Sequence, residues 1–221
     1  MIAILIAALQ QSAPLPPPAA DTSPFRRLEL PAPSLTRGAS GMPGPGYWQQ
    51  RADYTIRASL DTATHLLSGT VTIRYTNNSP DTLRYVWLHL EQNLFRSDSR
   101  GAALNAAPNA EGMGFAGHWF RSPGITVPTA VAVRLARRGD VTRVPLVPRV
   151  NGTLLRLDLD RPLAPAEIVT LDLAFEFRAP EEGTFRTVHG QLGEGRVYEI
   201  AQWYPRLAVY DDVRGWNTEQ Y

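Results

Sequence analysis

The chain has 221 residues, room for one domain of ordinary size and some additional chain, and its 43% hydrophobic content is enough for a buried core. The formal net charge of +1 gives no sign of a nucleic-acid-binding surface. The absence of Cys excludes a disulfide framework, thiolate metal sites and a lipid-modified Cys anchor.

Residues 1–45 predict an export signal followed by a tether. Residues 2–9 form an apolar run, and the polar and small residues 10–13 after it resemble the exit of a secretory signal, although no Lys or Arg precedes the run. The run is too short to span a bilayer as a helix. Residues 12–45 are rich in Pro, Ala, Gly and Ser, a composition that cannot bury enough surface to fold. We therefore expect export to the periplasm or the exterior, with residues 46–221 as the folded domain.

From Tyr47 onward the sequence predicts one strand after another. Apolar and polar residues alternate over residues 54–60 and again over residues 67–75, which is the period-2 pattern of half-buried strands. The turn residues 61–64 between them predict an antiparallel pair with one face in solvent. A dense turn cluster, residues 77–81, follows this pair.

Residues 83–90 predict a strand with apolar residues on both faces. Leu83, Tyr85 and Trp87 would lie on one face, and Val86, Leu88 and Leu90 on the other. This pattern requires that other parts of the protein cover both faces of the strand. We therefore expect the strand to be central in its sheet or packed beneath another domain.

Residues 91–126 interrupt the strand pattern with many glycines and alanines. A loop of this length inside a compact domain is usually functional or disordered. Three aromatic residues in its second half, Phe115, Trp119 and Phe120, predict that this half docks on another surface.

Strands resume over residues 131–135, 155–159 and 169–177, of which the last has the clearest alternation in the chain. No segment has a sustained helical period with caps at both ends. The sequence therefore predicts an all-β fold, an antiparallel two-layer sandwich of saddle-like form.

The stretch 197–212 begins as a strand, which we expect to stop at Pro205 because proline has no N–H to give to a ladder. Gln202 lies just before this break, among the aromatic residues Trp203, Tyr204 and Tyr210. From residue chemistry alone two interpretations stay open. The Gln202 amide caps the last backbone groups of the strand, or it faces a cleft.

The residue types present do not make a self-sufficient active site. The four histidines are scattered, with no His-x-x-x-His pair and no short spacing to a carboxylate of the kind that zinc needs. A structural role is the better interpretation of each. His65 lies beside a turn, His89 in a strand, and His118 and His189 in loops.

Asp211 and Asp212 form the one adjacent pair of acids in this part of the chain. Neighbouring residues of a strand point to opposite sides, so a turn cap for residues 214–215 is favoured over a catalytic dyad. The chain has no Gly-x-Ser-x-Gly motif, phosphate-cradling loop or nucleotide fingerprint.

Two segments resemble the N-terminal β domain of the aminopeptidase N-like zinc metallopeptidases, which are gluzincins. The first comprises residues 54–61, 65–80 and 88–90, and residues 67–73 read Leu-Ser-Gly-Thr-Val-Thr-Ile, similar to the family's Leu-Ser-Gly-x-Val/Ala-x-Ile signature. The second, Ala201-Gln202-Trp203-Tyr204-Pro205 leading to Tyr210-Asp211-Asp212, resembles the family's Thr-Gln-x-Glu segment and the aromatic-Asp after it. The resemblance covers residues 47–221, the N-terminal domain alone.

The resemblance implies that this domain packs over a thermolysin-like catalytic domain and that Gln202 helps to hold the amino end of a peptide substrate. Ala201 stands where the family has Thr. The family's Glu, which supplies negative charge for the substrate's α-ammonium group, falls at Tyr204, whose hydroxyl accepts hydrogen bonds but has no charge at neutral pH. Charge would then have to come from another residue, or the preference for free amino ends would weaken.

The family's zinc motif, His-Glu-x-x-His with a downstream Glu, and its Gly-x-Met-Glu-Asn loop do not occur in the 221 residues. We therefore expect an N-terminal piece of a longer exported metallopeptidase, truncated at its C-terminal end, whose zinc ligands and catalytic machinery follow Tyr221. This span alone should bind no zinc and no nucleic acid, should not span a membrane and should not hydrolyse peptides. The alternative is a free-standing exported β-sandwich that binds a protein or polysaccharide through its loops.

Overall fold

The computed structural model describes residues 32–105, 124–135, 141–181 and 187–219. The chain divides into two compact units, residues 1–46 and residues 47–221. The export signal expected over residues 1–13 and the aromatic residues Phe115, Trp119 and Phe120 lie outside the described residues, as does His118. No helix in the ranges given above is long and apolar enough to cross a membrane.

The described part of the first unit, residues 32–46, is a small loop closed by backbone hydrogen bonds. Arg37 and Pro43 form an isolated antiparallel bridge, and the N–H groups of Gly44 and Gly46 donate to the carbonyls of Thr36 and Leu35. No residue of this loop is buried. The Pro- and Gly-rich composition therefore gives local turns without a core.

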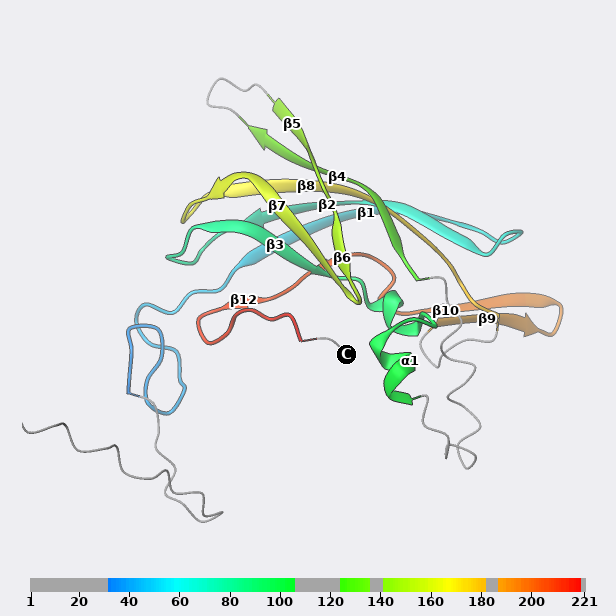
Figure 1. Ribbon diagram of the computed structural model, residues 1–221, viewed down its shortest axis with the longest axis horizontal. Helices are drawn as coiled ribbons and strands as arrows, with labels where there is room; N and C mark the ends of the chain where they lie inside the picture. The colour runs from blue at the N-terminus through cyan, green and yellow to red at the C-terminus, as the bar shows by residue number, and fades with distance from the viewer. Residues whose placement is uncertain (1–31, 106–123, 136–140, 182–186, 220–221) are drawn as a thin grey trace, which may run out of the picture. The chain divides into compact units, whose positions relative to one another are not determined.

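Two antiparallel sheets make up most of the second unit (Figure 1). The five-stranded sheet has the order β1-β2-β8-β4-β5, and the four-stranded sheet the order β11-β3-β7-β6. The strands of the first are β1 (Arg51–Asp61), β2 (Leu66–Thr76), β8 (Ile168–Arg178), β4 (Thr126–Leu135) and β5 (Val141–Leu146). Those of the second are β11 (Arg206–Leu207), β3 (Leu83–His89), β7 (Leu154–Leu163) and β6 (Arg149–Asn151).

Smaller elements complete the unit. A hairpin is formed by β9 (Thr187–Leu192) and β10 (Gly195–Ile200), and a second pair by β12 (Tyr210–Asp211) and β13 (Gly215–Trp216). After β3 come a 3₁₀ turn, η1 (Glu91–Phe95), and a short helix, α1 (Arg100–Asn105), so the first half of the expected loop 91–126 contains local helical structure.

One hydrophobic core joins the two large sheets. Its fully buried members come from alternate positions of the strands on both sides, and they include Val71, Ile73, Val86, Leu88, Leu155, Leu157, Leu171 and Leu173. The alternation predicted for residues 67–75 and 169–177 is what builds this interior, because successive side chains of a strand point to opposite faces. The predicted all-β antiparallel fold is confirmed.

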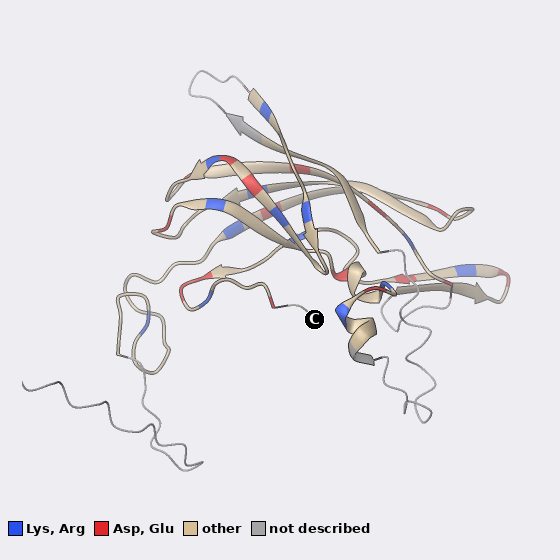
Figure 2. Cartoon of the chain, in the orientation of Figure 1, with Lys and Arg blue, Asp and Glu red and all other residues tan. Residues whose placement is uncertain are grey.

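Charged residues of both signs share the same strands (Figure 2). Arg143 on β5 and Asp172 on β8 pair across the sheet at 2.9 Å, and Arg156 and Asp158 pair along β7 at 2.7 Å. Interspersed charges of this kind solvate the outer faces and are worth little individually in stability.

Strand β3 is central in its sheet, between β11 and β7, as one of the two expectations stated. The predicted assignment of Leu83 to the face of Tyr85 is wrong, because the register shifts between Leu83 and Tyr85 and turns Leu83 into the core. Tyr85 and Trp87 are only half-buried, and the Arg156 guanidinium lies 4.0 Å from the centre of the Tyr85 ring. A cation over the ring provides part of the cover that the pattern predicted.

Gly69, in the Leu-Ser-Gly signature of residues 67–73, has to be glycine for a steric reason. It pairs with Phe175 across β2 and β8, and the buried Phe175 ring lies over it. A Cβ atom at Gly69 would be 2.6 Å from the carbonyl oxygen of Arg57 and 2.8 Å from Cζ of Phe175. Only glycine leaves room for the ring at this position.

We expect Gly69→Ala to lower the free energy of unfolding by about 1–3 kcal/mol, because the added methyl group displaces Phe175 or the β1 backbone. Urea denaturation measures the change. Gly190→Ala is the matched control, since a Cβ atom at that strand position meets nothing within 4 Å. Equal losses in the two variants would contradict the steric explanation.

Candidate functional site

Gln202 lies in a sharp turn directly after the β9–β10 hairpin. Strand β10 ends at Ile200, and Gln202 has a φ of 52°, in the left-handed region. The prediction that this strand runs to Pro205 is therefore wrong. A left-handed backbone at a non-glycine residue costs roughly 1–2 kcal/mol, so this turn has to be held by its surroundings.

A buried amide from η1 holds the turn. Gln92 is 1% exposed, and its Nε2 donates to the carbonyl oxygen of Ala201 at 2.6 Å and to Oγ1 of Thr187 at 2.9 Å. Thr187 pairs with Ile200, so the two bonds fix both ends of the hairpin at its base. One NH₂ group has two donors, and both are used.

Next to this clamp is a pocket of about 380 Å³, and its wall contains Gln202 and Tyr204 together. The full lining is Glu91, Ile200, Ala201, Gln202, Trp203, Tyr204 and Arg206. The structure thus places both predicted site residues at one hollow. Gln202 also takes part in an interaction within the protein, so lining the pocket does not exclude a structural role.

Glu91 and Arg206 are pocket residues that the sequence analysis did not single out. Glu91 is 4% exposed, and its Oε1 accepts from Nη2 of the half-exposed Arg206 in an ion pair. Among the described residues, Oε2 of Glu91 has no hydrogen-bond donor. The sequence did contain a signal for Glu91. It directly follows a strand with apolar residues on both faces, and an acid next to such a buried strand normally has a charged or hydrogen-bonding partner.

Tyr204 is wedged among aromatic rings. Its ring centre lies 5.2 Å from that of Trp203 and 6.0 Å from that of Tyr54, both in edge-to-face geometry. Trp203 in turn lies 6.0 Å from Phe175, the ring above Gly69. The two family-like segments therefore meet in space, since Tyr54 and Gly69 belong to the first and residues 203–204 to the second.

The Tyr54 hydroxyl ties this aromatic group to the backbone after the pocket. It accepts a hydrogen bond of 3.0 Å from the N–H of Leu207, the second residue of β11. Burial raises the pKa of Tyr54, although the hydrogen bond from Leu207 opposes that shift. The phenol is therefore neutral at ordinary pH and keeps its acceptor role.

Of the acid pair at 211–212, Asp211 caps the turn, the role that the sequence favoured for this pair. Oδ1 of Asp211 accepts from the N–H of Val213 at 2.9 Å and from that of Arg214 at 2.7 Å, and these bonds close the turn between β12 and β13. Asp–backbone bonds of this kind are typical of tight turns.

The described histidines do not gather into a metal site. His65 lies in the turn before β2 and His89 at the end of β3, as predicted, but His189 is in β9 and not in a loop. Burial lowers the pKa of His89. Over the described ranges, no group of three or more His, Cys, Asp or Glu side chains could hold a metal ion.

Comparisons with known proteins give only loose likenesses. No family model and no curated protein matches the chain. Among solved structures, an M1 zinc metallopeptidase from Deinococcus radiodurans bound to a Tyr-Ser-Ala substrate is similar at a TM-score of 0.36 and 16% identity, over 63% of this chain and 23% of that one.

Two further matches are a two-domain M1 zinc metallopeptidase bound to L-tryptophan and a bovine atadenovirus type 4 fibre head. The first has a TM-score of 0.36 and 15% identity, over 66% of this chain and 24% of that one. The second has a TM-score of 0.28 and 9% identity, over 59% and 99%. The match thus spans about a quarter of the length of the two peptidases. Likenesses at these TM-scores carry no conclusion about activity.

The ion pair at the pocket is testable through stability. We expect Arg206→Gln to lower the free energy of unfolding by about 1–3 kcal/mol, because it leaves the buried Glu91 carboxylate without its cation. The double variant Glu91→Gln/Arg206→Gln should recover most of this loss. Urea denaturation at neutral pH measures both.

Arg149→Gln is the matched control, since Arg149 pairs at 3.6 Å with Asp158, whose side chain is 41% exposed. A change within about 0.5 kcal/mol is expected there. If the double variant were no more stable than Arg206→Gln, the cost would come from lost packing of the arginine stem and not from the unpaired charge.

Proposed function

We propose that residues 46–221 are the N-terminal, non-catalytic β domain of an exported, zinc-dependent metallopeptidase of the aminopeptidase N-like kind. In this proposal the pocket beside the hairpin holds the amino end of a peptide substrate. The observation that carries it is the position of Gln202, which the sequence resemblance singles out. It is held in a left-handed turn on the wall of a pocket together with Tyr204.

Strain at a binding position supports this proposal over a purely structural role. Left-handed non-glycine residues persist where the surrounding structure fixes them, and they cluster at ligand-binding positions. Gln92 is the group that fixes the conformation, through its bond to the Ala201 carbonyl.

Glu91 supports the proposal because it could supply the negative charge that Tyr204 lacks. The family's negative charge is missing at position 204, but the same pocket contains the carboxylate of Glu91. Oε1 of Glu91 is paired with Arg206, while Oε2 has no donor within the described residues. A buried carboxylate oxygen without a donor is a costly feature that an ammonium group would relieve. In the proposal, Gln202 and Tyr204 orient the substrate and Glu91 supplies the charge.

The chemistry of peptide hydrolysis would belong to a catalytic domain beyond this span. None of the described side-chain groups fits a zinc ion, so no hydrolytic step is derived from them. Zinc, when bound by such a domain, would polarise the scissile carbonyl and activate water. The contribution of residues 46–221 would be to position the substrate's amino end.

The test uses two substitutions of Gln202 in the full-length enzyme. Gln202→Gly removes the amide and also relieves the left-handed backbone, so stability should be kept or raised while kcat/KM for peptides with a free amino end falls about tenfold, the effect of one hydrogen bond to a charged group. Gln202→Ala removes the same amide but keeps the backbone strain. Peptides with an acetylated amino end are the control substrates, and their kcat/KM should not change.

Glu91→Gln should lower kcat/KM for free amino ends by a similar factor, because the ammonium group loses its charged partner. Unchanged kinetics in both Gln202 variants would return Gln202 to a capping role. Kinetics that change equally for free and acetylated peptides would contradict recognition of the amino end.

A further inference from the structure

The β9–β10 hairpin is attached to the rest of the domain mainly through polar side chains. Its strands hydrogen-bond to each other and to no other strand in the described part of the chain. Its two buried side chains are Thr187 and His189, while Leu192 and Val197 are 73% and 48% exposed. Apart from Ile200 at the base, which packs against the core, the hairpin therefore lacks hydrophobic anchorage.

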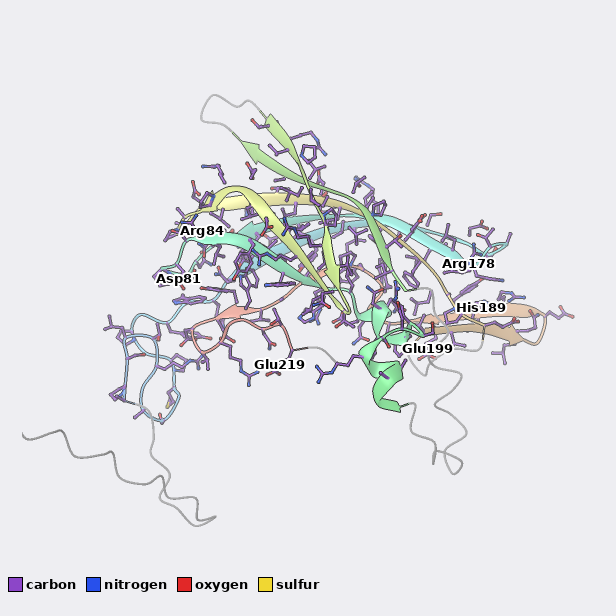
Figure 3. All side chains as sticks on the ribbon, in the orientation of Figure 1. Asp81, Arg84, Arg178, His189, Glu199 and Glu219 are labelled. Carbon is purple, nitrogen blue, oxygen red and sulfur yellow. The ribbon has the colours of Figure 1, made fainter. Side chains whose placement is uncertain are left out.

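The second attachment, after the Gln92 clamp, is a contact between two histidine rings. The rings of His65 and His189 are stacked, with centres 3.8 Å apart and planes at 22°. The Tyr198 hydroxyl is 2.7 Å from Nδ1 of His65 and is thus hydrogen-bonded to it. His65 is in the turn between β1 and β2, so these contacts join the hairpin to the end of the large sheet. His189 and Arg178 mark this end in Figure 3.

The geometry requires His189 to be neutral. Nη1 of Arg196 lies 3.1 Å from Nδ1 of His189, and a guanidinium can only donate, so Nδ1 is the acceptor and Nε2 carries the hydrogen. A proton added to His189 would go to Nδ1. It would break the bond to Arg196 and place two positive groups about 3 Å apart, beside a second imidazole in stacking contact.

Other charged and titratable groups surround the stack. Glu181, just before the hairpin, favours protonation of His189, while His65 and Arg196 oppose it. Asp61, the last residue of β1, interacts with His65. Arg178 of β8 donates to the carbonyl of Thr64, next to His65. The charged groups near the rings are thus two guanidinium groups, of Arg178 and Arg196, and two carboxylates, of Asp61 and Glu181.

Burial lowers the pKa of His189, and the charges of His65 and Arg196 lower it further. The unfolded or undocked chain therefore binds this proton more tightly than the docked hairpin does. Docking is fully stable above the ordinary histidine pKa of about 6.5, and it weakens as the pH falls through that value.

We propose that the His65–His189 stack is a pH-sensitive latch that holds the β9–β10 hairpin against the β1–β2 turn near neutral pH and releases it in acid. Release would leave the hairpin held near its base, by Gln92, by the packing of Ile200 and by the backbone bond from His189 N–H to the Pro180 carbonyl oxygen. Ala201 and Gln202 follow directly after β10, so the pocket wall would become mobile together with the hairpin. The latch would couple the order of the pocket to the acidity of the surroundings.

Amide hydrogen exchange of the purified protein tests the latch. Between about pH 8 and about pH 5, and after correction for intrinsic exchange, we expect protection of residues 188–199 to fall about tenfold, the effect of one lost side-chain bond. Protection of residues 171–175 in β8 should not change. His189→Phe keeps a stacked ring without a titrating group and should remove the pH dependence.

Arg196→Gln is a second variant that tests the latch if His189→Phe does not fold. Arg196 is exposed, so its replacement should leave the fold intact. Loss of its charge makes protonation of His189 easier, so the midpoint of release should shift to higher pH. Arg84→Gln, at an exposed position on β3, is the matched control and should leave the midpoint in place. A pH-independent hairpin in the unaltered protein, or an unchanged pH dependence in His189→Phe, would overturn the proposal.

Discussion

The candidate site depends on one buried amide. Gln92 lies in η1, just after β3 of the four-stranded sheet. Both N–H groups of its side chain donate hydrogen bonds at the base of the β9–β10 hairpin, one at each end of it. Those bonds, together with the packing of Ile200 against the core, fix the direction in which the chain turns at Gln202. The amide is 1% exposed, and both of its N–H donors are satisfied, although its Oε1 has no partner among the described residues. The direction of a flexible turn is thereby set by the rigid core.

The electrostatics of the pocket follow from unequal burial. Arg206 is half-exposed and partly solvated, whereas its partner Glu91 is almost fully removed from water. The carboxylate therefore depends on protein groups for stabilisation, and one of its oxygens lacks a donor in the described structure. In the proposed function this oxygen receives the substrate's ammonium group, and the aromatic rings around Tyr204 form the apolar part of the pocket wall.

Much of the fold could be predicted from the sequence because its strands have one face in solvent. Period-2 alternation identified β1, β2, β7 and β8, and turn residues identified the pairing of β1 with β2. The features that escaped depend on contacts distant in sequence. The left-handed turn at Gln202 is held by Gln92, the buried His189 by a histidine from another hairpin, and the inward Leu83 by a register shift against β7. For the site, the sequence pointed to Gln202 and Tyr204, but Glu91 became visible only when η1 was placed beside them.

The position of β8 has a consequence for how the domain is made. This strand lies between β2 and β4, and the side chains of Thr72 and Asp172, bonded across the β2–β8 pair, are 100 residues apart in the chain. During synthesis β1 and β2 can pair early, but β2 presents an open edge and an apolar face until residue 178 has left the ribosome. Long-range strand insertion of this kind is slow and exposes aggregation-prone surface. Nascent chains of this protein would therefore depend on chaperones that shield a half-built sheet.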